Sequence, residues 1–288
     1  MTWLSQLLAK SGIKNPLSSR QSRVPAGLWT KCAACSTNIL TEKLMNNLNV
    51  CEYCQHHHPL SIKERIKSIM DPNFKYIDIK LPEDDPLNFV DTKEYKKRLK
   101  DARGNCTFKD AFAVVDGTIS DMPAISVFMD FNFIGGSMGI AVGNAIVKAA
   151  QIAVERRIPA IIFTSSGGAR MQEGLFALMQ MPRTVIAVDS IKKAGVPYIV
   201  VMTYPTTGGV LASFASRATF TLAEPGAVIG FTGARVIKDT LGIKLPKGFQ
   251  TAEFIKDKGF IDAIISRKAI KSKLTSILSI FNLDKTTI

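Results

Sequence analysis

The sequence predicts an α/β fold with parallel strand pairing, preceded by a small four-cysteine module. Short, continuously apolar segments alternate with longer helical stretches in the second half of the chain, as in a parallel sheet covered on both faces. Four of the five cysteines form two Cys-x-x-Cys pairs before residue 55. The 288 residues, 46% of them hydrophobic, suffice for a buried core. The chain contains no continuous apolar run of about 18 residues, so we expect no membrane span.

Residues 1–26 predict a flexible basic arm. The segment contains lysine, arginine and serine residues but no acidic residue, a composition shared with organelle transit peptides. The whole chain has a net charge of +13, and both of its ends are basic. Such ends attract anionic partners such as nucleic acid, but they are equally typical of a solvated surface, so charge leaves both interpretations open.

Residues 27–58 predict a zinc ribbon held by Cys32, Cys35, Cys51 and Cys54. Their spacing is C-x2-C-x15-C-x2-C. Each pair places two thiolates on one tight turn, and two such turns supply a tetrahedral zinc site. Disulfides would need an oxidising compartment, for which the sequence carries no secretory signal. Because four cysteines leave no coordination position for a substrate, we expect one structural Zn²⁺ per chain.

The three histidines follow the last cysteine directly, at His56, His57 and His58. We expect a structural or surface role for them, because the cysteines already complete the zinc site and adjacent rings cannot converge on one point. No other histidine is available for a Ser-His-Asp or Cys-His arrangement. Cys106 is interpreted as a small core residue rather than a nucleophile.

Residues 59–106 predict a polar, helical connecting segment. Isoleucines with helical spacing from Ile62 to Ile69 indicate a helix that ends at Asp71-Pro72. A turn is expected at 83–86 and a short charged helix from Tyr95 to Arg103.

Residues 107–288 predict the main α/β domain. Apolar runs at 111–115 and 124–129 indicate two strands joined through Asp116-Gly117. A helical stretch from Gly139 to about Arg157 follows. Buried strands at 159–164 and 197–202 are each expected to end in a turn with paired glycines, and each turn is followed by a helix.

The paired glycines Gly167-Gly168 and Gly208-Gly209 are the main chemical feature of this domain. Glycine allows a ligand close to the backbone, and a helix N-terminus carries unpaired N–H groups and partial positive charge. Such a turn can hold a phosphate or a developing oxyanion, or it can be only a tight connection. Neither turn matches the phosphate-binding loop of nucleotide hydrolases or the dinucleotide fingerprint.

Several longer motifs extend this pattern from about residue 27 to residue 268. They are the two cysteine pairs and the segments 27–32, 48–51, 130–139, 166–174, 205–210, 223–227, 229–231, 245–246 and 248–250. In this fixed order they resemble the carboxyltransferase β subunit of bacterial-type and plastid acetyl-CoA carboxylase. The chain departs from the family pattern at Arg217-Ala218-Thr219, where Gly-Asp is usual, and at Ala33-Ala34 and Glu52-Tyr53 in the cysteine turns.

The resemblance implies a crotonase-like spiral of ββα units carrying the N-terminal zinc ribbon. It implies transfer of a carboxyl group from carboxybiotin, on a carrier protein, to acetyl-CoA, which gives malonyl-CoA in the first committed step of fatty acid synthesis. The expected location is the cytoplasm, or the stroma in a plastid-bearing cell.

The resemblance also assigns site residues and partners. Gly208, Gly209, Gly167 and Gly168 are implied as catalytic, and Ala169, Arg170, Gly135 and Gly136 as substrate-binding. Carboxybiotin supplies its own base, so the expected task of the protein is to stabilise enolate oxygens with N–H donors. Because one unit builds half of a two-sided site, we expect an α2β2 complex with an α subunit, acting with a biotin carboxyl carrier protein and the ATP-dependent biotin carboxylase.

Two other functions compete with this one. A nucleic-acid-binding ribbon protein would use the basic arm together with Lys31. A related acyl-CoA enzyme, such as a decarboxylase subunit or a hydratase, shares the fold. A hydratase needs a carboxylate acid/base, for which Glu173 is the best-placed candidate, although an acidic group in the first turn of a helix is the simpler interpretation.

Overall fold

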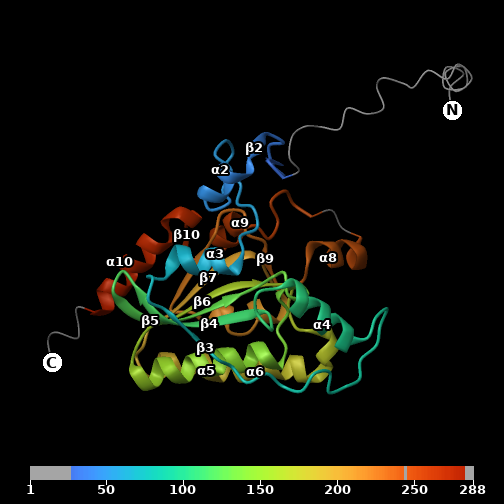
Figure 1. The fold of residues 1–288 in the computed structure, drawn as a ribbon, viewed down its shortest axis with the longest axis vertical. Coiled ribbons are helices and arrows are strands. Elements are labelled where there is room, and N and C mark those ends of the chain that lie inside the picture. Colours follow the sequence, from blue (N-terminus) through green and yellow to red (C-terminus); the bar gives the residue numbers. More distant parts are fainter. Residues whose placement is uncertain (1–26, 243–244, 283–288) are drawn as a thin grey trace, which may run out of the picture.

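A computed structural model describes residues 27–242 and 245–282 of the chain. The predicted basic arm, 1–26, and residues 283–288 lie outside these described residues. The described part consists of a mixed sheet with helices on both faces and a small module above it (Figure 1).

The small module contains the four cysteines. Strands β1 (Trp29–Lys31) and β2 (Asn38–Leu40) form an antiparallel hairpin, and helix α2 (Thr41–Asn46) follows directly. Its core consists of Cys32, Ile39, Leu44 and Cys51 alone. So small a core supplies little stability by itself, which fits a module held by a metal.

The connecting segment is only partly helical. Helix α3 (Ile62–Ile69) forms as predicted and begins with a capping box between Ser61 and Glu64, and its isoleucines are buried. Helix α4 (Tyr95–Asn105) also forms. Between them, β3 (Lys75–Ile77) pairs antiparallel with β4 and becomes the edge of the main sheet. Three residues give no readable periodicity, so this strand was not predicted.

The main sheet has the strand order β10-β8-β7-β6-β5-β4-β3, with β9 paired to β7. The strands are β4 (Phe112–Ile119), β5 (Met122–Met129), β6 (Ala160–Ser166), β7 (Tyr198–Thr207), β8 (Phe220–Ala223), β9 (Ile229–Gly230) and β10 (Ala263–Ile264). Pairing is antiparallel from β3 to β5 and parallel from β5 to β10. The predicted parallel pairing of β6 and β7 is confirmed.

The turn between β4 and β5 differs from the prediction. It lies at Ser120-Asp121, where both residues have positive φ, and not at Asp116-Gly117. Gly117 is paired with Ala124 inside the hairpin. A Cβ added to Gly117 would lie 2.8 Å from the Cβ of Phe74, so the glycine makes room for a neighbouring aromatic residue instead of forming a turn.

Helices cover both faces of the sheet. Helices α5 (Ile140–Arg156) and α6 (Gly174–Lys193) pack on one face, and α3 and α10 (Ile270–Asn282) pack on the other (Figure 1). The helix expected after Gly209 is a single turn, α7 (Gly208–Leu211). Helices α8 (Ala234–Leu241) and α9 (Ala252–Asp257) complete the described set. Within the described ranges, no helix has the length and apolar character needed to cross a membrane.

Candidate active site and metal centre

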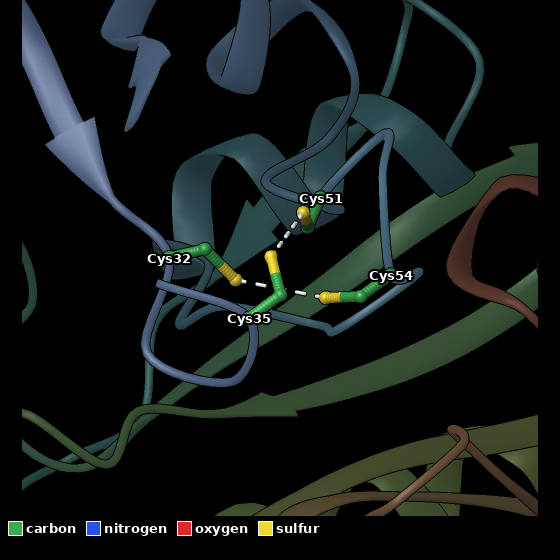
Figure 2. A group of neighbouring side chains, drawn as sticks. All are labelled: Cys32, Cys35, Cys51 and Cys54. Atoms are coloured by element: carbon green, nitrogen blue, oxygen red, sulfur yellow. Dashed lines mark hydrogen bonds between the residues drawn. The ribbon is translucent and has the colours of Figure 1, made fainter. Parts of the chain in front are cut away.

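The four cysteine sulfurs converge on one point in the small module (Figure 2). All lie within 4.8 Å of one another, with Sγ–Sγ distances of 3.7 Å for Cys32–Cys54 and 3.8 Å for Cys35–Cys51. A tetrahedral zinc site with Zn–S bonds of about 2.3 Å requires sulfurs roughly 3.8 Å apart. A disulfide requires about 2.05 Å. The arrangement therefore fits a four-sulfur zinc site and not a pair of disulfides.

The sulfurs differ in how readily they lose a proton. The hydroxyl and N–H of Thr37 lower the pKa of Cys35 to about 6. At Cys54 the N–H of His56 favours the thiolate, but desolvation and the neighbouring sulfurs raise the pKa to about 12. A metal ion that binds here must therefore displace protons, as zinc does from cysteine ligands.

Three glycine loops meet where β5, β6 and β7 end. The Gly167 N–H donates to the Gly135 carbonyl at 2.9 Å, and the Met138 N–H donates to the Gly168 carbonyl at 2.8 Å. A Cβ added to Gly208 would lie 3.0 Å from the Cα of Gly168, and Gly208 has a φ of +61°. Close backbone contact and positive φ thus require glycine at this junction.

The N–H groups at this junction are not equivalent. Those of Gly167 and Gly168 already donate within the protein, the second to Ser166 Oγ at 3.0 Å. Gly208 and Gly209 begin α7, and the first N–H groups of a helix have no acceptor within that helix. No described residue accepts a hydrogen bond from the Ala169 N–H. The Ala169 N–H is therefore open to a ligand, and the start of α7 is a second candidate donor position beside it.

Arg170, which was predicted to bind substrate, has a buried side chain that contacts other protein groups. Its side chain is 1% exposed, and its guanidinium forms a bidentate pair with Asp110 at 2.6 and 3.0 Å. It also donates to Tyr95, Glu173 and both the hydroxyl and the carbonyl of Ser137. The N–H donors of Arg170 are thus used inside the protein. Its hydrogen bonds to Ser137 hold the 135–139 glycine loop in place, and its guanidinium is not exposed to a substrate.

Glu173 is likewise a supporting group. Its carboxylate accepts from the Tyr95 hydroxyl at 2.7 Å and from the Ile140 N–H at 2.6 Å. It therefore caps the N-terminus of α5, and Glu173 itself stands at the N-cap position of α6, at the start of a helix as predicted. A Cβ at Gly139 would lie 2.3 Å from this carboxylate, which explains the glycine there. The acid/base role required for a hydratase has no support in this buried arrangement.

Cys106 and the three histidines, which were predicted to have structural roles, lie in different surroundings. Cys106 is half-buried against the core, as expected, and burial raises the pKa of its thiol. His56 is exposed, whereas the side chains of His57 and His58 are buried. These histidines line a cavity of about 430 Å³ between the cysteine module and the sheet.

Arg217, at the departure from the family pattern, forms an exposed bidentate pair with Asp189 of α6.

Besides the cluster around Arg170, the structure contains a buried charge cluster at this cavity that sequence reasoning missed. Glu224, directly after β8, contacts Arg65 and Arg267. The three residues are more than 40 positions apart from one another, so no local pattern reveals them. The Ala-Glu-Pro-Gly-Ala motif was recognised, but not the contacts of its glutamate.

Comparisons with known proteins agree with this arrangement. Residues 76–252 match the model of the carboxyl transferase domain. The acetyl-coenzyme A carboxylase carboxyl transferase subunit beta of Granulibacter bethesdensis is 46% identical over 280 residues, covering 97% of this chain and 91% of that protein. The Pelobacter propionicus protein of the same name is 43% identical and covers 97% and 98%.

Solved structures give the same fold. Transcarboxylase 12S superposes with a TM-score of 0.62 at 25% identity, covering 76% of this chain and 41% of that one. A Pseudomonas malonate decarboxylase hetero-dimer superposes with a TM-score of 0.59 at 21% identity, covering 77% and 86%. The predicted fold class, an α/β carboxyltransferase body with a four-cysteine module, is confirmed.

The chain therefore belongs to the carboxyl transferase family, whose domain spans the glycine loops. Within that family its relatives are acetyl-coenzyme A carboxylase carboxyl transferase beta subunits, which match it over nearly their full length. It is accordingly a carboxyltransferase subunit.

Proposed function

We propose that this subunit transfers the carboxyl group of carboxybiotin, presented by a carrier protein, to acetyl-CoA and so forms malonyl-CoA. The observation that carries the proposal is a glycine-lined sheet edge at which the Ala169 N–H has no acceptor among the described residues and helix α7 begins. Carboxybiotin, when bound, supplies both the carboxyl group and the base for the methyl proton.

The task of this chain is then to bind the thioester and stabilise its enolate oxygen. Gly208 and Gly209 present helix N-terminal N–H groups, which favour negative charge. Ala169 presents a further N–H from the adjoining loop. Gly135, Gly136, Gly167 and Gly168 form the adjoining loops, and we propose that the thioester lies against their backbone. Loss of one such donor typically raises the barrier by about 3 kcal/mol.

The metal proposed for the cysteine module is Zn²⁺, bound by Cys32, Cys35, Cys51 and Cys54. Sulfur spacing supports this choice, because it matches a tetrahedral site of four thiolates. With four protein ligands the ion holds the fold of the module and takes no part in the reaction.

An α subunit is proposed to complete the site along helix α6. Five large apolar side chains on one face of this segment are between 52% and 72% exposed: Met171, Leu175, Leu178, Met179 and Ile186. They recur at helical spacing and begin next to the Gly167–Arg170 loop. Exposed apolar patches of this kind mark protein interfaces, so a partner here would sit beside the reacting atoms.

Reconstitution tests this function. The chain is purified alone and together with a candidate α subunit, and malonyl-CoA formation from acetyl-CoA and carboxybiotin is measured by chromatography. We expect activity in the complex and close to none in the chain alone. Substantial activity without the second subunit would contradict the two-subunit site. Release of acetyl-CoA from malonyl-CoA without any biotin would instead identify a decarboxylase subunit.

A further inference from the structure

The buried cluster around Glu224 joins three distant parts of the chain. Its Oε1 accepts from Arg65 Nη1 at 2.7 Å and from Arg267 Nε at 2.9 Å, and its Oε2 accepts from Arg267 Nη2 at 2.8 Å. The exposed fractions are 7% for Arg65, 1% for Glu224 and 4% for Arg267. Burial alone would raise the pKa of Glu224, but the two guanidinium groups hold it well below its usual range.

Arg267 carries this cluster over to the cysteine module. Its Nη1 donates to the carbonyls of Leu48 at 2.8 Å and His58 at 2.9 Å. Leu48 and His58 flank the second cysteine pair. His57 Nδ1 lies 3.6 Å from Glu224 Oε2 on the same side. One carboxylate therefore fixes the orientation of an arginine that bonds the main chain of the module directly.

The cluster forms one side of the 430 Å³ cavity, and sheet residues that precede the glycine loops form another. From the sheet, the cavity is lined by Asp130–Asn132, Ser165 and Tyr204. Ser165 comes two residues before Gly167, and its carbonyl is the atom that a Cβ at Gly136 would strike. From the module, the lining is His56–His58. The module is thus a wall of a space that adjoins the glycine loops.

This wall carries hydrogen-bonding groups without protein partners. His58 Nε2 is buried and makes no hydrogen bond with the described residues, and the only polar contact of His57 Nδ1 among them is the long one of 3.6 Å with Glu224. Arg65 bonds Glu224 through Nη1, and its other N–H groups have no acceptor among the described residues. A buried polar group without a partner is unfavourable, so a polar molecule bound here would gain those contacts. Amides and phosphates, the groups of coenzyme A, are suitable partners.

We propose that Glu224 is a positioning residue that, with Arg65 and Arg267, holds the zinc ribbon in place as one wall of the cleft for the coenzyme A thioester. This inference rests on the proposed function. Glu224 does not touch the reacting atoms, so its effect falls on binding of the thioester and not on the chemical step.

The test uses Glu224→Gln in the reconstituted complex. We expect the KM for acetyl-CoA to rise about tenfold, the equivalent of 1.4 kcal/mol, with kcat and the KM for carboxybiotin nearly unchanged. In the chain alone, hydrogen exchange over residues 27–58 should accelerate while the zinc content stays at one per chain. The exchange measurement does not depend on activity.

Two further variants separate positioning from stability. Asp71→Asn breaks a similar link between distant segments, because Asp71 accepts from Lys271 and Thr118, away from the cavity. It should lower the Tm without changing any KM. Arg267→Lys keeps the charge but loses the bidentate contact, and a smaller KM increase is expected. Arg267→Lys serves as the test if Glu224→Gln does not fold, since breaking a buried ion pair is strongly destabilising.

Unchanged KM values in Glu224→Gln and Arg267→Lys, with lowered Tm, would overturn the inference and leave the cluster purely structural. A loss of kcat at constant KM would overturn it as well. If the wild-type complex forms no malonyl-CoA, the proposed function fails. Normal exchange of the ribbon in the variants would then refute the attachment separately.

Discussion

A substitution at Gly209 gives the most direct test of the proposed mechanism. A Cβ there would lie 3.5 Å from the Cβ of Ala169 and 3.0 Å from Met181 Sδ. We expect Gly209→Val to lower kcat about 10²-fold or more, because a branched side chain would block the approach to the N–H donors. Tm and binding of the α subunit should change far less.

The control for this substitution is Gly104→Val in α4, where an added Cβ has no neighbour within 4 Å. It should leave kcat unchanged. Measuring kcat per active site together with the melting temperature separates a role of Gly209 in catalysis from a role in stability. A stable, assembled Gly209→Val enzyme with normal turnover would show that this glycine takes no part in the mechanism.

Single residues were predictable from sequence when their chemistry is local. The cysteine pairs and the paired glycines were identified because their spacing alone defines a tight turn. Arg170 was identified, but its contacts with Asp110, Tyr95 and Ser137 were not, because only the fold brings these residues to it. Contacts between residues 33 to 75 positions apart leave no local signal.

At the scale of elements, helix α6 carries the sharpest prediction. Leu178→Glu places a charge in the exposed apolar face, so we expect it to prevent assembly with the α subunit. The isolated chain should keep its Tm, since the side chain is already in water. Ile280→Glu, on exposed α10 at the other face of the sheet, is the matched control and should assemble normally. Size-exclusion chromatography with light scattering measures both. Normal assembly of Leu178→Glu would exclude this face as the interface.

The elements themselves followed from sequence where periodicity is long. Helices α3, α4 and α5 and strand β6 were predicted close to their bounds, whereas β7 begins as predicted but continues five residues beyond the predicted end, to Thr207. The sequence did not reveal β3, which is three residues long and stabilised by pairing with β4. Asp116-Gly117 was misread as a turn, because space beside Phe74 and not backbone reversal demands the glycine.

For the whole molecule, the ribbon and the sheet should respond differently to loss of metal. The ribbon core holds four residues, two of them cysteines, whereas the sheet has an extended core on each face. We expect elemental analysis to give one zinc per chain. Chelation, or Cys51→Ser, should unfold residues 27–58 and leave the body folded. Hydrogen exchange would show this as protection lost in the ribbon alone. A metal-free protein with a protected ribbon would contradict the zinc site.

The contact between Arg267 and the ribbon also sets an order of events during synthesis. Arg267 lies 209 residues after His58, whose carbonyl it binds. At typical rates of 5–20 residues per second, the ribbon leaves the ribosome roughly 10 to 40 s before its anchor is made. During that interval the ribbon lacks its hydrogen bonds to Arg267. Early capture of the metal by the four cysteines would then hold the fold of the ribbon before its anchor is made.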